Sequence, residues 1–240
     1  MIKTLFLLQK QDIVSKMSMF FYNRYMKRTI RQQVYSLLKE RIMNDYYKPG
    51  YRLSEQEICD ELHVSRSPVR EALRDLEADD LVIGEANKGV RIRVFTEQDV
   101  KSFYEIEMNF QLSSVEDLPK KLPEDVINIY KELKKDFEES YKNNDLQKYL
   151  NTCERLHRQI VSLSTNTFFE PLYRKIGTLN HRFRLISLKN FKRFDQSYTE
   201  HIDMIDAILD GDITKAKKVI RTHFGGALDV VLMTTPQNIE

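Results

Sequence analysis

The spacing of apolar and polar residues predicts a mainly helical chain with one short β-hairpin in its first half. From Thr29 onward, apolar residues recur every three or four positions, which is the spacing of one helix face, until Pro49-Gly50 ends the pattern. Beyond Asp99, helical patterns follow one another without a second strand-rich segment. They cover residues 97–116, 123–142, 145–165, 168–187, 193–210 and 213–232. The C-terminal part of the chain is therefore predicted to be an all-helical bundle.

Two short helices and the hairpin follow the first helix. Ser54 is expected to cap the first of these short helices in a capping box with Glu57. Ser67 is expected to cap the second, with Pro68 at the first helical position, where proline has no amide proton to lose. The hairpin strands are expected at 81–83 and 90–94. Two helices joined by a tight turn and followed by a hairpin form a winged helix-turn-helix, which places its second helix in the major groove of DNA.

Composition limits the remaining fold and function classes. The 240 residues are enough for one large domain or two small ones, and seven glycines and six prolines leave little room for a many-stranded β fold. A net charge of +2 excludes a histone-like polycation but allows a local basic patch. Two cysteines, Cys59 and Cys153, cannot form a disulfide framework, which favours the cytoplasm. No run approaches the roughly 18 apolar residues that span a membrane.

The second short helix carries a row of cations. Arg66, Arg70 and Arg74 recur every four residues and therefore share one face of the helix. The planar guanidinium group suits bidentate hydrogen bonding to guanine and also binds phosphate. In the alternative interpretation, these arginines form a solvated face that pairs with Glu71 and Asp75. The capped helix before them and the basic wing after them favour DNA. Two hydroxyl groups and a wing cation complete the predicted contact surface: Ser65, Ser67 and Lys88.

Four residues on the apolar faces of three predicted helices form a candidate metal site. Cys153 and His157 lie four positions apart on one helix, and His201 and His223 lie on two others. A divalent cation needs neutral imidazoles that converge from fixed supports, and the interior of a helical bundle supplies them. Each histidine alone is equally compatible with a hydrogen-bonded core residue, so the residues by themselves leave both interpretations open.

The sequence around the two short helices resembles the signature of GntR-family bacterial transcription regulators. The resemblance rests on Pro49-Gly-Tyr-Arg-Leu53, Glu57-Ile58 and Val64-Ser-Arg-Ser-Pro-Val-Arg-Glu-Ala-Leu73. It implies that Arg66, Ser67 and Arg70 contact the operator and that Gly89 in the wing approaches the minor groove. Gln56 occupies a position where some family members carry a DNA-contacting arginine.

Residues 99–232 resemble the FadR-type C-terminal ligand-binding domain, FCD, which is all-helical. The matching segments are Leu156-His-Arg-Gln-Ile160, Glu200-His201 and Gly211-Asp212. The resemblance implies a bound divalent metal, with zinc expected, held by His157, His201 and His223. Metal-binding members add an aspartate four residues before the first histidine, and Cys153 stands there as a conditional fourth ligand. The family's usual arginine and glutamate in the first helix of this domain are replaced by Glu107 and Gln111.

Together these features predict a cytoplasmic, homodimeric, non-enzymatic transcription regulator that binds a palindromic operator and senses a small organic acid, a carboxylate, beside a metal. The predicted parts are an N-terminal extension at 1–27, a winged helix-turn-helix domain at 28–95, a linker at 96–98, a helical effector-binding and dimerisation domain at 99–233 and a tail at 234–240. Two alternatives stay open. One is a metal-dependent hydrolase with a DNA-targeting domain, which would need a general base beside the metal. The other is a metal-free regulator whose helical domain serves only for dimerisation.

Overall fold

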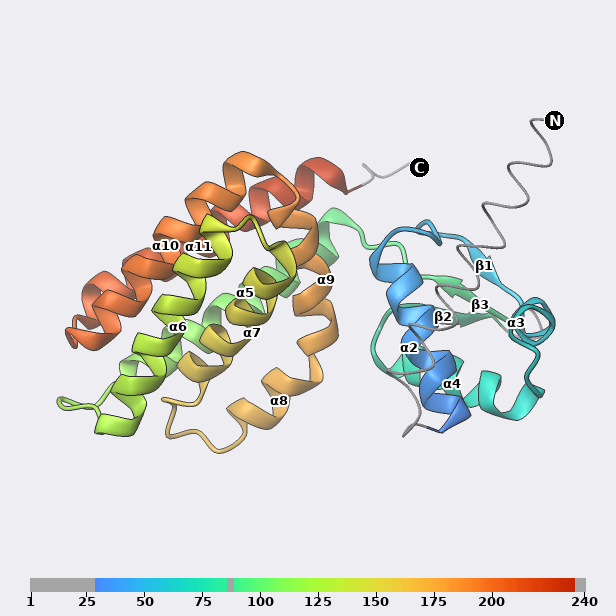
Figure 1. The fold of residues 1–240 in the computed structure, drawn as a ribbon, viewed down its shortest axis with the longest axis horizontal. Coiled ribbons are helices and arrows are strands. Elements are labelled where there is room, and N and C mark those ends of the chain that lie inside the picture. Colours follow the sequence, from blue (N-terminus) through green and yellow to red (C-terminus); the bar gives the residue numbers. More distant parts are fainter. Residues whose placement is uncertain (1–28, 86–88, 236–240) are drawn as a thin grey trace. The chain divides into compact units, whose positions relative to one another are not determined.

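The computed structural model describes residues 29–85 and 89–235, and the chain divides into two compact units between Arg93 and Val94. Figure 1 labels the helices and strands of both units. Three predicted features lie outside the described residues: the extension at 1–27, the wing residue Lys88 and most of the tail at 234–240.

The first unit is a winged helix-turn-helix, as the sequence predicts (Figure 1). Its elements are α2 (Ile30–Met43), β1 (Arg52–Leu53), α3 (Glu55–Leu62), α4 (Arg66–Ala78), β2 (Val82–Glu85) and β3 (Gly89–Ile92). The strands form an antiparallel sheet in the order β1-β3-β2. β1 has only two residues, which is too short for an alternating pattern, so the residue pattern does not predict it. Helices α2 and α4 are in contact, and the buried side chains of Leu38 and Leu76 belong to the core of this unit.

Helix α4 begins two residues earlier than predicted. Its N-cap is Ser65 and its first residue is Arg66, so the prediction that Ser67 caps the helix and Pro68 opens it is wrong. Pro68 is instead the third helical residue. Proline is tolerated there because amide protons of the first turn have no acceptor within the helix. The earlier start makes Arg66 part of the helix rather than of the turn.

Gly89 opens β3 in a conformation that other residues rarely adopt. Its φ angle is +85°, in the left-handed region that favours glycine. A Cβ atom at this position would lie 2.6 Å from the carbonyl oxygen of Leu53 on β1. The wing therefore needs glycine here both for its backbone conformation and for the close pairing of β3 with β1.

The second unit is the predicted all-helical bundle (Figure 1). Its helices are α5 (Glu97–Glu116), α6 (Glu124–Lys142), α7 (Leu146–Val161), α8 (Phe169–Lys175), α9 (Gly177–Leu188), α10 (Phe191–Leu209) and α11 (Ile213–Thr234). The pattern at 168–187 is two helices rather than one. Gly177 stands at the break, where its backbone entropy disfavours a continuous helix. The predicted linker at 96–98 is the start of α5, with Thr96 as its N-cap.

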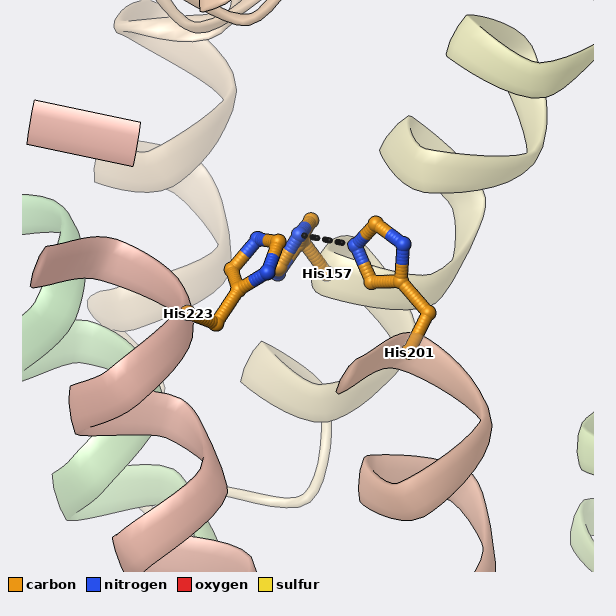
Figure 2. A group of neighbouring side chains, drawn as sticks. All are labelled: His157, His201 and His223. Carbon is orange, nitrogen blue, oxygen red and sulfur yellow. Dashed lines mark hydrogen bonds between the residues drawn. The ribbon is translucent and has the colours of Figure 1, made fainter. Parts of the chain in front are cut away.

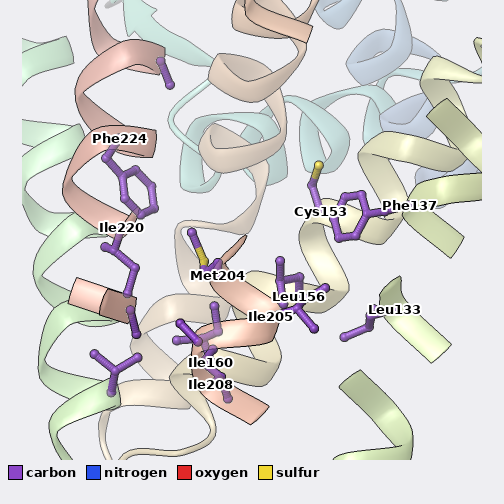
Figure 3. Packing of buried hydrophobic residues seen from close by; sticks show 14 of the residues in the cluster. Leu133, Phe137, Cys153, Leu156, Ile160, Met204, Ile205, Ile208, Ile220 and Phe224 are labelled. Carbon is purple, nitrogen blue, oxygen red and sulfur yellow. The ribbon is translucent and has the colours of Figure 1, made fainter. Parts of the chain in front are cut away.

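Polar caps and a shared apolar core position the long helices of the bundle. Thr96, Asp145, Asn190 and Asp212 each accept a hydrogen bond from the backbone N–H three residues further on, which satisfies a first-turn donor. Figure 3 shows buried side chains of α6, α7, α10 and α11 packed together, among them Phe137, Leu156, Ile205 and Ile220. The helices that carry the three histidines are thus held by one core. Within the part of the chain described, no helix is long and apolar enough to cross a membrane.

Candidate DNA-binding face and metal centre

One face of the first unit is a groove of about 960 Å³ that is lined by α3, α4 and the wing. Arg66, Arg70 and Arg74 line this groove from α4, as their spacing predicts, and Arg52 and Gly89 line it from the sheet. The opposite side of α4 is buried through residues such as Val69 and Leu76, which turns the arginine row outward. Ser65 and Ser67 are exposed at the start of the helix.

Two arginines of the groove are held by the first turn of α3. Nη2 of Arg66 donates to Oε1 of Gln56 at 2.6 Å, and Nε of Arg70 donates to Oε2 of Glu55 at 2.7 Å. Sequence reasoning named Gln56 but missed Glu55, because only the fold brings the start of α3 against α4.

Glu71 and Asp75 do not take the role that the solvated-face alternative gives them. Both lie instead near Arg31 of α2, whose guanidinium is 2.5 Å from Asp75 and 3.8 Å from Glu71. Their carboxylates therefore tie α4 to α2 on the side away from the arginine row.

In the second unit, three buried histidines from three helices converge. His157 lies on α7, His201 on α10 and His223 on α11, and one ring nitrogen from each lies within 4.8 Å of the other two (Figure 2). The Nε2 atoms of His157 and His201 are 3.3 Å apart. The exposed fractions of the three residues are 0%, 1% and 7%, so the group is shielded from bulk solvent. The sequence alone left open whether the three histidines meet, and in the structure they do.

Neighbouring polar groups orient two of the imidazole rings. Oε2 of Glu200 accepts from Nδ1 of His223 at 2.8 Å, which places a proton on Nδ1 and leaves the Nε2 lone pair free. The hydroxyls of Tyr149 and Ser197 lie 3.0 Å and 3.3 Å from Nδ1 of His201. Both rings thus direct their other nitrogen away from these partners. Such support is typical of metal-binding histidines.

Burial keeps the three imidazoles neutral. It lowers the pKa of His157 and of His201 well below the ordinary histidine value, and the charges of nearby arginines act in the same direction. Burial also lowers the pKa of His223, although its bond to Glu200 opposes that effect. Neutral imidazole is the form that binds a metal ion.

Cys153 lies beside this group but is not one of its converging members. Its Sγ atom is 4.0 Å from Nδ1 of His201, whereas the nitrogen of His201 that faces His157 is Nε2. Burial raises the pKa of the Cys153 thiol to about 12, which favours the protonated form over the thiolate.

The three histidines line a small cavity of about 20 Å³, and charged side chains of α5, α9 and α10 line it as well. Arg193 is 1% exposed, and its Nη2 donates to Oε2 of Glu200 at 2.6 Å, while its Nε and Nη1 have no partner among the described residues. Glu107 accepts from the hydroxyl of Tyr173 at 2.9 Å and lies 3.4 Å from Arg184. Burial raises the pKa of Glu107, and Arg184 and the hydroxyl of Tyr173 oppose the rise.

Glu107 and Gln111, both on α5, lie near the histidines. Glu107 lines the cavity, and Gln111 donates through Nε2 to the backbone carbonyl of His157 at 3.1 Å. Sequence reasoning did not identify Arg193 or Tyr149 as part of this site. Nothing in their local sequence marks them, because their roles depend on how α7, α10 and α11 pack.

Family models match both units of the chain. The model described as bacterial regulatory proteins, gntR family, matches residues 30–92, and the FCD domain model matches residues 102–226. A helix-turn-helix-type transcriptional regulator of Bacillus subtilis, YdhC, is 27% identical, with 80% of this chain and 86% of that protein covered. The gluconate operon transcriptional repressor of the same species is 24% identical, with 70% and 68% covered.

Solved structures support the same architecture. A crystal structure of a GntR transcriptional regulator from Rhodococcus sp. RHA1 matches with a TM-score of 0.70 and 24% identity, covering 86% of this chain and 99% of that one. At this level of identity the similarity establishes the fold alone. The curated relatives are transcription regulators rather than enzymes.

Proposed function

Because this chain belongs to the gntR family of DNA-binding bacterial transcription regulators and carries an FCD domain, we propose that its helical unit senses a small carboxylate beside a divalent metal ion. The observation that carries the proposal is the convergence of three buried, neutral histidines next to a buried arginine with unpartnered donors. A single cavity thus offers ligands for a cation and donors for an anion.

The donor set fits a divalent ion such as zinc. In a tetrahedral zinc site with bonds of 2.0–2.1 Å, two nitrogen ligands lie about 3.3–3.4 Å apart. The separation of 3.3 Å between the Nε2 atoms of His157 and His201 agrees with that value. His157, His201 and His223 would hold the ion, and a bound ion would supply positive charge to an anionic ligand. The position of Cys153 supports a site of three histidines without its thiolate.

Arg193 supports a carboxylate as the sensed group. A buried guanidinium with unpartnered N–H groups is costly unless an acceptor satisfies them, and a carboxylate oxygen is a strong acceptor. The charged residues that line the cavity each have a partner of opposite charge: Arg184 pairs with Glu107, and Arg193 pairs with Glu200, which lies outside the lining. A divalent ion among neutral histidines would leave an excess of positive charge, which an organic acid would compensate. One relative is named for the gluconate operon, and gluconate is a carboxylate.

In the first unit, we assign the DNA contact to the groove lined by α4 and the wing. Arg66 and Arg70 would make the main contacts, and Ser65, Ser67 and Gln56 would support them from the same face. Gly89 would bring the wing backbone close to the minor groove, and Lys88 would add a phosphate contact.

A homodimer on a palindromic operator is the arrangement that we propose, since helix-turn-helix dimers read two half-sites related by a two-fold axis. We place this activity in the cytoplasm, where a bacterial regulator meets its DNA. Sedimentation of the full-length protein and footprinting of the bound operator test the assembly and its symmetry. A monomer on an asymmetric site would contradict it.

The metal and the carboxylate are tested together on full-length protein purified without chelator. We expect about one divalent ion per chain by elemental analysis and a rise in the unfolding temperature of the zinc-loaded protein when acetate or lactate is added. Ethanol and propane-1,2-diol serve as matched ligands without a carboxylate. Absence of stoichiometric metal, with no thermal shift on adding zinc, would favour the metal-free regulator whose helical domain serves only for dimerisation.

A further inference from the structure

Two residues in the first turn of α3 contact Arg66 and Arg70 of the groove through different chemical groups. Gln56 contacts Arg66 through a neutral amide, whereas Glu55 contacts Arg70 through a carboxylate. Arg66 therefore faces no countercharge in this contact, while the charge of Arg70 is partly offset by the carboxylate of Glu55 at 2.7 Å, in an ion pair that is open to solvent. A partly offset charge releases fewer counterions from DNA and so contributes less to non-specific affinity.

The atoms used in these contacts differ as well. Glu55 engages Nε of Arg70, and within the described residues Nη1 and Nη2 of Arg70 have no partner. These two terminal nitrogens form the fork that donates to O6 and N7 of guanine. Gln56 instead takes one of the two N–H groups on Nη2 of Arg66, which ties that terminal nitrogen to α3. The terminal nitrogens of Arg70 are thus available to donate to a base, whereas Arg66 is better suited to a phosphate contact.

The charges of the described residues that line the groove also indicate different roles for Arg66 and Arg70. Among the described residues that line it are four arginines and four glutamates, namely Arg52, Arg66, Arg70, Arg74, Glu55, Glu57, Glu77 and Glu85. A lining in which the described charges balance attracts DNA weakly in general, so apart from the wing cation Lys88 affinity must come mainly from groups placed to match one sequence. Positioning of Arg70 then matters more than its charge.

We propose that Glu55 is a specificity-determining positioning residue, which directs the terminal nitrogens of Arg70 to a base and suppresses binding to unrelated DNA. The proposal rests on the DNA contacts assigned to Arg66 and Arg70 in the proposed function. It predicts a separation of roles: loss of Arg70 lowers discrimination between sequences, and loss of Arg66 lowers affinity for all sequences and reduces the salt dependence.

The test is a fluorescence-anisotropy titration of full-length protein with the footprinted operator duplex and with a scrambled duplex, each at several salt concentrations. For Glu55→Ala we expect the ratio of operator affinity to scrambled affinity to fall about tenfold. Binding to the scrambled duplex should tighten, and its salt slope should steepen by up to about one ion, because no carboxylate then offsets the charge of Arg70. Circular dichroism and thermal unfolding confirm that each variant is folded.

Glu57→Ala is the matched control. Glu57 lies in the same helical turn and lines the same groove, but its carboxylate contacts neither arginine. Its loss should strengthen binding to both duplexes and leave their ratio unchanged. In an Arg70→Ala background, Glu55→Ala should cause no further fall in the ratio, because the residue it positions is gone.

The outcomes separate this inference from the proposed function. If Arg70→Ala lowers the ratio but Glu55→Ala behaves like Glu57→Ala, the positioning role of Glu55 is overturned while the DNA contact of Arg70 stands. The inference also fails if Glu55→Ala lowers the ratio equally with and without Arg70. If Arg70→Ala itself leaves the ratio unchanged, the contact assigned in the proposed function is wrong, and the role of Glu55 falls with it.

Discussion

Nε2 of His157 and Nε2 of His201 face each other across 3.3 Å in the interior of the bundle, although 44 residues separate them in the chain. In a metal-free protein, one of these nitrogens must carry a proton so that the two lone pairs do not oppose each other. An ion between them would satisfy both lone pairs at once. Metal binding at this contact would therefore release the proton that one of the two Nε2 atoms carries in the metal-free protein.

The first prediction concerns the loss of one metal ligand. His201→Ala should abolish retention of the divalent ion, because His157 and His223 alone cannot hold it against a chelator. Elemental analysis after dialysis against a mild chelator measures the retained ion. His63→Asn is a matched control, because this histidine lies in the other unit and its φ of 54° suits asparagine.

Cys153→Ala decides whether the thiol takes part in that site. Since Sγ lies beside Nδ1 of His201 rather than beside Nε2, this variant should retain the ion with nearly unchanged affinity. The expected cost is a loss of core packing, which lowers the free energy of unfolding by about 1–2 kcal/mol. Loss of the ion in this variant would show that the thiolate is a fourth ligand.

The pH dependence of stability follows from the burial of the same histidines. Burial lowers the pKa of His157, His201 and His223 in the folded state, while the unfolded chain keeps a value near 6.5. As pH falls through about 6.5, the unfolded chain therefore binds more protons, and the free energy of unfolding of the metal-free second unit should fall. Each histidine contributes up to about 1.4 kcal/mol per pH unit until its folded-state pKa is reached.

Urea unfolding in chelator at pH 7.5 and 5.5 measures this dependence. Glu107 acts in the opposite direction, because burial raises its pKa and its folded form takes up a proton first as pH falls. His157→Gln should reduce the slope by about one proton. A free energy of unfolding that is equal at both pH values would contradict the neutral, buried state of the three rings.

The sequence predicts the faces of the helices well but not how the helices meet. Each histidine could be assigned to an apolar face because helical periodicity is local. Their convergence, the contact of Glu55 with Arg70 and the burial of Arg193 depend on packing between segments far apart in the chain. The helix faces made the three histidines a candidate set together with Cys153, and the resemblance to a family favoured metal binding over separate core roles.

Gly89→Ala tests the wing. The new Cβ would lie 2.6 Å from the carbonyl oxygen of Leu53, and the φ of +85° would strain any side chain. We expect β3 to shift away from β1 and the free energy of unfolding of the first unit to fall by about 1–3 kcal/mol. Operator affinity should fall as well. Gly225→Ala is the control. Gly225 lies in α11, where an added Cβ would meet no atom within 4 Å outside its own stretch of helix, so the change should stabilise the protein by about 0.4–1 kcal/mol.

The last prediction separates the carboxylate-binding role of Arg193 from its structural role. Arg193 donates to Glu200 and to the backbone carbonyl of His223 at 2.9 Å, so its removal would leave the partly buried carboxylate of Glu200 without this cation. Arg193→Lys keeps a positive charge for Glu200 but removes Nε and Nη1, the unpartnered donors assigned to the carboxylate. This variant should therefore retain the ion and the fold.

Calorimetric titration of the zinc-loaded Arg193→Lys variant with acetate or lactate measures the effect. Affinity should fall at least about tenfold, which corresponds to the loss of one or two charge-assisted hydrogen bonds at about 1.5–3 kcal/mol each. Lys189→Ala, an exposed change just before α10, should bind the carboxylate as the unaltered protein does. If Arg193→Lys keeps both the ion and the full carboxylate affinity, Arg193 only supports Glu200 and His223, and the carboxylate must bind through the ion or Arg184 instead.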